Sequence, residues 1–209
     1  MNGTKTITAL YDRTEDAQSA LRDLQNMNIS RDNISLIASD AAGTYSHDNG
    51  NGISTQSDAA EGAVAGATFG GIGGLVVGLA ALAIPGIGPV LAAGPLASAL
   101  IAAGIGAGVG AVTGGIVGAL TEMGVSEEAA GYYAEGIRRG GTLLTVHVPE
   151  NMSKQVMDVL NRHNAIDVED RVSQWRESGW QMHDPNAKPY GVDEIESERN
   201  RYTGERMRV

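Results

Sequence analysis

The sequence predicts an α+β protein whose sheet domain is interrupted by a long apolar hairpin of helices. Residues 6–39 and 142–172 each read as a strand, a helix and a strand. Between them, residues 62–121 carry no charged side chain, and glycines recur there at every fourth position. Two such strand–helix–strand units make the ferredoxin-like arrangement, a sheet with two helices on one face. The apolar stretch is then an insertion whose two ends return to the same domain.

The first half of the sheet domain is expected in residues 1–40. Residues 6–11 have the composition of a strand, and residues 14–27 follow with alanines and leucines at helical spacing. Residues 33–38 read as the second strand. Residues 41–58 are rich in Asp, Asn, Gly and Ser, which predicts a flexible linker before the apolar stretch.

A glycine-zipper helical hairpin is predicted for residues 59–123. Residues four positions apart lie on one face of a helix, so each glycine series forms a groove where another backbone can approach closely. Pro85, Gly86, Gly88 and Pro89 form a strong helix breaker and are the expected hairpin turn. Each arm is long enough to cross about 30 Å of hydrocarbon at about 1.5 Å per residue. The glycines expected to pack helices within and between copies are Gly62, Gly66, Gly70, Gly74, Gly78, Gly106, Gly110, Gly114 and Gly118.

Residues 124–172 are expected to hold a lead-in helix and the second half of the sheet domain. The helix, residues 126–139, starts at a capping serine, with glutamates in its first turn and arginines in its last. A strand at 142–148, a helix at 153–164 and a strand at 166–172 follow. A shift of 136 residues superposes the apolar pattern of the two units, which predicts an internal duplication.

The C-terminal segment, residues 173–209, is predicted to be a polar tail. It carries both tryptophans, Trp175 and Trp180, among six basic and seven acidic residues. We expect the two rings to dock on the sheet or on a neighbouring copy, which would hold the tail in place. A membrane-interface anchor and a partner-binding segment are the alternatives.

Composition argues against several classes of function. The net charge is −10, and phosphate contacts need clustered Lys and Arg, so we expect no nucleic-acid partner. Cysteine is absent, which leaves no disulfide framework and no thiol nucleophile. The first residues lack the basic start and apolar core of a signal peptide, so we expect a chain made in the cytosol and not exported.

No catalytic, cofactor-binding or metal-binding residues are predicted. The glycine-rich stretch holds no Lys or Arg, so it does not match a phosphate-binding loop. The four histidines fall in different predicted elements, with no carboxylate at ligand spacing. Asp167, Glu169 and Asp170 read as a solvated strand edge. We therefore expect a protein that is not an enzyme.

The sequence resembles a family of bacterial general stress proteins of the heat- or low-temperature-induced type. The resemblance is carried by residues 7–12, the breaker at 84–89, the second glycine series, and the run from Val125 to Leu144. It covers roughly residues 4–172. It implies a stress-associated, non-enzymatic protein with a glycine-zipper hairpin, and it supplies no catalytic residues.

Two arrangements could bury the apolar hairpin. Its length, its lack of charge and its small-residue spacing favour a membrane, which would place the protein on the cytoplasmic side of the inner membrane. Acidic flanks, and boundaries without Trp or Tyr, favour a soluble cytoplasmic ring, shell or filament with the hairpins as its dry interior.

In both arrangements the partner is a further copy of the chain, with a lipid bilayer as the possible second partner. We expect a non-catalytic stress protein that self-assembles through the hairpin, inserted in or associated with a membrane. The soluble homo-oligomeric scaffold is the alternative. An enzyme or ligand sensor built on the sheet has only the predicted fold in its favour.

Overall fold

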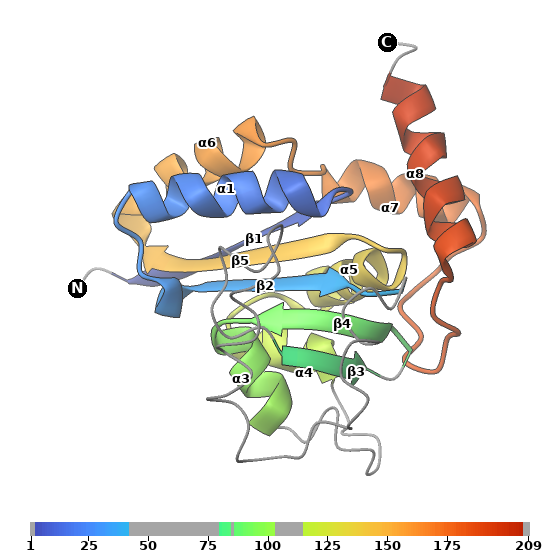
Figure 1. Ribbon diagram of the computed structural model, residues 1–209, viewed down its shortest axis with the longest axis horizontal. Coiled ribbons are helices and arrows are strands. Elements are labelled where there is room, and N and C mark those ends of the chain that lie inside the picture. Colours follow the sequence, from blue (N-terminus) through green and yellow to red (C-terminus); the bar gives the residue numbers. More distant parts are fainter. Residues whose placement is uncertain (1–2, 42–79, 85, 103–114, 207–209) are drawn as a thin grey trace, which may run out of the picture.

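The computed structural model describes residues 3–41, 80–84, 86–102 and 115–206 (Figure 1). These residues form a five-stranded antiparallel sheet and seven α-helices, an α/β fold. The strands, in the spatial order β1-β5-β2-β4-β3, are β1 (Thr4–Tyr11), β5 (Thr142–Pro149), β2 (Ile34–Ser39), β4 (Gly88–Ala93) and β3 (Ala80–Ile84). The α-helices are α1 (Thr14–Asn26), α3 (Pro95–Ala102), α4 (Gly115–Glu122), α5 (Glu127–Arg138), α6 (Ser153–Arg162), α7 (Val168–Glu177) and α8 (Val192–Arg206). Short 3-10 turns lie at Arg31–Asn33 and Glu150–Met152.

Helices cover both faces of the sheet. Consecutive strand residues point to opposite faces, and β2 and β5 are buried along most of their length. Ile37 and Leu143 face a core covered by α3, α4, α5 and α7, whereas their neighbours Leu36 and Leu144 face a core under α1 and α6. Figure 1 shows α1 and α6 side by side on their face. The sheet is therefore the middle layer of three.

The predicted elements of the two halves are mostly confirmed. Strands β1, β2 and β5 and helices α1, α5 and α6 lie where the sequence places them. β5 pairs with β1 on one side and β2 on the other, and α1 packs against α6. The sheet is nevertheless five-stranded, and its outer strands are not those of the predicted ferredoxin-like domain.

The predicted strand at 166–172 is wrong, because α7 occupies most of this segment. Asp167 caps the helix, accepting hydrogen bonds from the backbone N–H groups of Glu169 and Asp170. One backbone hydrogen bond from Ile166 N to Leu10 O, 2.8 Å long, links the segment to β1. An N-cap with two acids in the first turn favours a helix over an edge strand.

The predicted helical arms are also wrong over residues 80–84 and 88–93, which form a β-hairpin. Leu82 and Ile84 are buried while Ala83 between them is exposed, the two-residue period of a strand. Residues 86–87 make the expected turn, but this turn joins strands and not helices. The remaining parts of the arms are helical at α3 and α4, and residues 59–79 and 103–114 lie outside the described residues.

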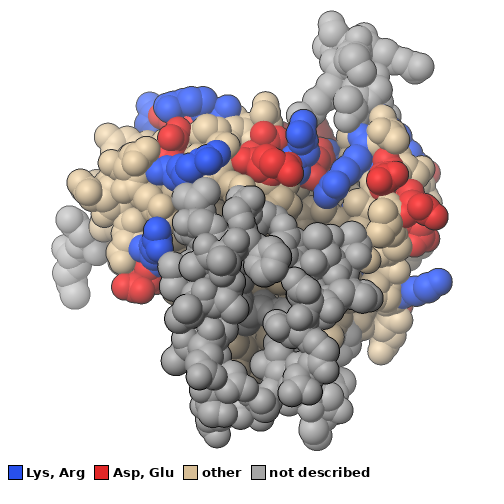
Figure 2. All heavy atoms as spheres, in the orientation of Figure 1, with Lys and Arg blue, Asp and Glu red and all other residues tan. Residues whose placement is uncertain are grey.

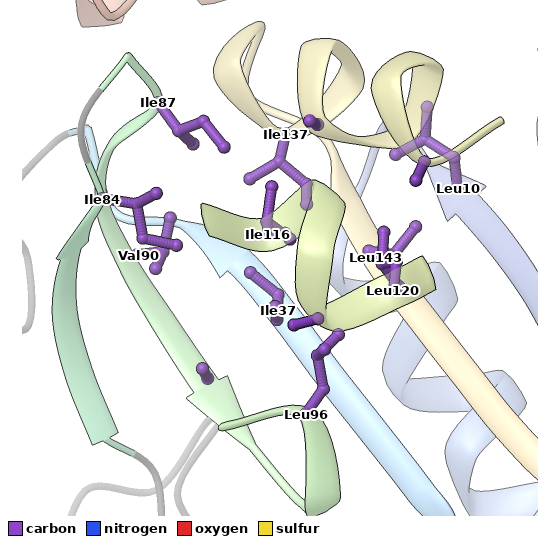
Figure 3. Close-up of a cluster of buried hydrophobic side chains, with 14 of the residues drawn as sticks. Leu10, Ile37, Ile84, Ile87, Val90, Leu96, Ile116, Leu120, Ile137 and Leu143 are labelled. Carbon is purple, nitrogen blue, oxygen red and sulfur yellow. The ribbon is translucent and has the colours of Figure 1, made fainter. Parts of the chain in front are cut away.

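The described part of the apolar stretch belongs to the core of the domain. The hairpin adds β4 and β3 to the edge of β2, and α3 packs against both α4 and the sheet. In Figure 3 side chains from the hairpin, from α3 and α4 and from the central strands converge: Ile84, Val90, Leu96, Ile116, Leu120, Ile37 and Leu143. None of the helices in the described ranges has the length and apolar character needed to cross a membrane.

The predicted polar tail is largely folded. Trp175 lies in α7 and is buried in the core beneath α5, and α8 follows after a non-helical connector over residues 178–191. In Figure 1 α8 stands at one end of the molecule, beside α7. On the face drawn in Figure 2, Lys and Arg lie next to Asp and Glu along the upper edge.

Candidate functional site

Glu135, the most deeply buried charged side chain in the described residues, lies near the C-terminal end of α5 with Arg138 and Arg139. This helix lies very close to the sheet, because Gly136 has no side chain. A Cβ there would come within 2.4 Å of the Leu10 side chain. The close approach draws the last turn inward and buries Glu135, Arg138 and Arg139.

Each of these charges has an ionic partner. Arg138 Nε donates to Glu135 Oε2 at 2.8 Å, and Arg139 Nε donates to Glu135 Oε1 at 2.6 Å. Arg139 also reaches Glu198 of α8, donating from NH1 to Oε1 at 2.5 Å. Glu135 is 1% exposed and Glu198 6%. Charges this deep in a protein are tolerated only when paired and hydrogen-bonded.

Two aromatic side chains extend the cluster. Trp175 Nε1 donates to the Tyr202 hydroxyl at 2.9 Å, and that hydroxyl donates to Glu198 Oε1 at 2.6 Å. The Arg139 guanidinium lies 4.9 Å from the centre of the Trp175 ring, within the range of a cation–π contact. Glu198 therefore accepts hydrogen bonds from a guanidinium and from a phenol together.

A second arginine stands beside Tyr202. Arg171 of α7 makes a bidentate pair with Asp12, with N···O distances of 2.7 and 3.0 Å. Its guanidinium lies 3.5 Å from the centre of the Tyr202 ring. A void of about 10 Å³ next to these groups has room for about one water molecule. We call Arg139, Arg171, Trp175 and Gly140 together the arginine–aromatic socket.

The connector crosses the outer side of α5. Arg138 NH1 donates to Lys188 O at 2.9 Å, and the Tyr190 ring lies 4.6 Å from the Arg138 guanidinium. Nearer to α7, the backbone of Pro185 packs closely against Gly86 in the β3–β4 turn. The connector is thus attached both to the helix and to the hairpin.

Glu135 is held in its ionised form. Burial alone would raise the pKa of this carboxyl, but hydrogen bonds from its partners outweigh burial and lower the pKa from 4.5 to about 2. The two arginines account for the lower pKa, because both donate hydrogen bonds directly to the Glu135 carboxylate. His183 Nδ1 lies 3.9 Å from Glu135 Oε2, which is too far for a hydrogen bond. Burial, and then the nearby Glu198 carboxylate, raise the pKa of Tyr202, which keeps its hydroxyl protonated. Glu135 is therefore ionised and Tyr202 protonated near neutral pH.

The structure places few of the predicted packing glycines. Of the nine, Gly118 alone falls in the described residues, on α4, where an added Cβ would meet nothing within 4 Å. In the turn, Gly86 and Gly88 have φ of +75° and +102°, and Pro89 is opposite Ala83 in the β3–β4 pairing. Pro85 and the other eight glycines lie outside the described residues.

The two tryptophans lie together. Trp175 is 2% exposed, and the Trp180 ring packs edge-on against it at 5.6 Å between ring centres. Tyr132 of α5 also packs against Trp180, with 6.0 Å between ring centres. The rings connect α7 to α5 and to the start of the connector.

Sequence reasoning missed the charge cluster. The spacing of Glu135 to Arg138 and Arg139, three and four positions along a helix, was a usable signal for side-chain pairing. Nothing in the sequence indicates that Glu198 completes the cluster. Within the described ranges, no group of three or more His, Asp or Glu side chains is placed to hold a metal ion. Comparison of the chain with known protein families, with curated proteins and with solved structures finds no match.

Proposed function

We propose that this protein is a non-catalytic, stress-associated protein that assembles with further copies of itself through its uncharged glycine-rich segments. The observation that carries the proposal is the uncharged stretch, residues 62–121. The β3–β4 hairpin, α3 and α4 use part of this stretch for the core of the domain. Residues 62–79 and 103–114 remain, and apolar segments of this length are normally buried.

The spacing of the glycines supports contact between backbones. Gly66, Gly70 and Gly74 in the first series would form one smooth face on a helix, and a second series starts at Gly106. Because each copy carries both series, two copies present the same pair of surfaces to each other. Association through identical surfaces gives closed, symmetric oligomers.

The charge cluster supports a structural role for the folded domain. Glu135 binds two arginines with both of its oxygens and is ionised far below neutral pH, so it is a poor general acid or base. The ion pairs of Glu135 with Arg138 and Arg139, and of Arg171 with Asp12, fix the positions of α5 and α7 relative to the sheet. In the proposed assembly the domain is therefore a rigid carrier for the glycine-rich segments.

A soluble assembly agrees better with the fold than a membrane hairpin does. The hairpin at residues 80–93 lies within the sheet, so the predicted arms do not run uninterrupted through residues 59–123. Membrane attachment is the second candidate, favoured by residues 62–79, which are uncharged and would span about 27 Å as a helix at about 1.5 Å per residue. The first candidate places the protein in the cytoplasm, the second on the cytoplasmic side of the inner membrane.

The experiment that tests the proposal compares two double variants with a matched control. Gly70→Leu with Gly74→Leu, and Gly110→Leu with Gly114→Leu, should each reduce the particle mass measured by light scattering. Gly131→Ala on α5 should leave it unchanged, because the added Cβ meets only the His183 Cβ at 3.8 Å. An unchanged mass in both double variants would overturn self-association through glycines. Flotation with lipid vesicles then separates the membrane candidate from the soluble one.

A further inference from the structure

We propose that the arginine–aromatic socket is a binding site for an acidic helix that presents a Glu and a Tyr four residues apart. In the isolated chain the occupant is its own α8. In the assembly, we infer, the occupant is α8 of a second copy. This contact is separate from the glycine-rich segments and does not depend on them.

The attachment of α8 is narrow and combines polar with apolar contacts. Over residues 192–202, the part of the helix whose side chains the structure describes, Ile195, Glu198 and Tyr202 are buried, spaced three and four positions apart on one helix face. Arg199, between them, donates to Gly140 O at 3.0 Å. Val192, at the start of the helix, is 42% exposed. A helix held by three side chains on one face is a ligand more than a core element, because little buried surface opposes its release.

The socket is built by residues that are held in place without α8. Glu135 fixes Arg139, Asp12 fixes Arg171, and the Trp180 ring packs against Trp175. The first two contacts lie within the body of the domain, and the third is made by the first residues of the connector. Because its side chains are already ordered, the socket pays little entropy when it takes up a helix.

The socket also has a strong requirement for its occupant. Removing α8 would leave the guanidinium NH1 of Arg139 without its carboxylate and the indole N–H of Trp175 without its acceptor. Buried donors without partners are costly, so the site favours any helix that returns a carboxylate and a phenol in this geometry. Gly140 adds a shape requirement, because its missing side chain makes the space for Ile195.

The connector allows α8 to be exchanged between copies. Residues 178–191 are not helical, and Gly179 adopts a φ of +95° at the start. The eleven residues from 181 to 191 reach roughly 36 Å when extended, at about 3.3 Å each, so they can span to a neighbouring molecule once their contacts with α5 and the β3–β4 turn are released. Every copy carries the same helix and the same socket, so reciprocal exchange closes a symmetric pair. The second copy is therefore the partner that matches the socket best.

Recognition is tested first with a labelled peptide of residues 192–206 added to the full chain carrying Glu198→Gln, whose own α8 is weakened. The wild-type peptide should bind about tenfold or more tightly than a peptide with Glu198→Gln and Tyr202→Phe, since each change removes a hydrogen bond of the buried carboxylate. Binding that is indifferent to these two changes would overturn the proposal.

Exchange is tested by energy transfer, using the absence of cysteine in the chain for single-site labelling. One population carries Arg139→Gln and a donor dye at Asn200→Cys. The other carries Glu198→Gln and an acceptor dye at Glu177→Cys. Only α8 of the first and the socket of the second are intact, so their mixture should give transfer that excess wild-type peptide abolishes.

The baseline is the same labelled pair with both Arg139→Gln and Glu198→Gln in each chain. Energy transfer in this baseline pair reports association through the glycine-rich segments alone. A failure of that association is therefore seen in the baseline, separately from a failure of the exchange. Transfer no higher than this baseline, from chains with the wild-type circular dichroism spectrum, overturns the exchange. If Arg139→Gln prevents folding, the peptide measurement decides the proposal.

Discussion

Arg139 and Glu198 are 59 positions apart in the sequence, yet Arg139 NH1 lies 2.5 Å from Glu198 Oε1 in a buried ion pair. Arg139 directly follows the last residue of α5 and is buried, and Glu198 lies on the C-terminal helix α8. The carboxylate accepts a further hydrogen bond from Tyr202 on its own helix. The Glu198 carboxylate therefore connects α8 to the socket. Its removal should weaken the attachment of the C-terminal helix to the domain.

Glu198→Gln is expected to destabilise the protein by about 2 kcal/mol, because the buried Arg139 guanidinium keeps Glu135 but loses one of its two carboxylate partners. The expected sign is early loss of α8, seen as faster proteolytic cleavage in residues 178–191. Arg201→Gln is the control, since the Arg201 side chain is 54% exposed and its pairing with Glu198 is solvated. Equal unfolding free energies for the two variants would show that the pair is unimportant.

Glu135 makes stability depend on acid. In the folded protein the pKa of Glu135 is about 2, below the ordinary value of 4.5. Its contribution to the free energy of unfolding is therefore complete above pH 4.5 and is lost as the pH falls toward 2. The loss should be on the order of 3 kcal/mol. Urea unfolding at several pH values should show a smaller acid loss in Glu135→Gln than in the wild type.

The control for the acid experiment is Glu177→Gln at the exposed end of α7. This change should leave the acid dependence as it is in the wild type. A pH profile of Glu135→Gln that parallels the wild type would contradict the role assigned to the carboxyl. Glu135→Gln should also lower stability at neutral pH, because two buried arginines lose their shared partner.

The strands and helices with clear local patterns could be predicted from the sequence. Ser126 caps α5 as expected, its hydroxyl accepting from Ala129 N at 3.3 Å, and the apolar runs of β1, β5 and β2 form three neighbouring strands of the sheet. Here local propensity and tertiary structure agree, so the pattern is sufficient.

Prediction failed where tertiary pairing decides. The segment at 80–93 is apolar throughout, and a short apolar run does not distinguish a buried helix from a buried strand. Pairing with β2 settles it, since Ile37 lies opposite Ala92. At 166–172 the apolar pattern suggested a strand, but the cap at Asp167 determined a helix. The pair of Arg139 with Glu198 depends on the connector's path, which leaves no periodic signal.

Gly86 should be intolerant of any side chain. Its φ is +75°, and a Cβ would lie 2.2 Å from Pro185 O, a backbone atom that cannot rotate away. Gly86→Ala should therefore destabilise the protein by more than the roughly 1–2 kcal/mol of the left-handed conformation alone, measured by thermal or urea unfolding. Gly179→Ala isolates that conformational part, because Gly179 has a φ of +95° and open space around it. Similar losses of unfolding free energy in the two variants would mean that the close contact between Pro185 and Gly86 does not add to the cost of the substitution.

The apolar stretch should behave as core where the structure describes it. Leu120 on α4 is fully buried against the sheet, so Leu120→Ala should cost about 2–5 kcal/mol in the free energy of unfolding. Ile101, near the end of α3, is 52% exposed, and Ile101→Ala should cost less than about 1 kcal/mol. Urea unfolding of both variants measures the difference. A small loss for Leu120→Ala would mean that α4 is not part of the folded core and is available, like the rest of the stretch, for contacts between copies. A large loss would confine those contacts to the segments outside α3, α4 and the β3–β4 hairpin.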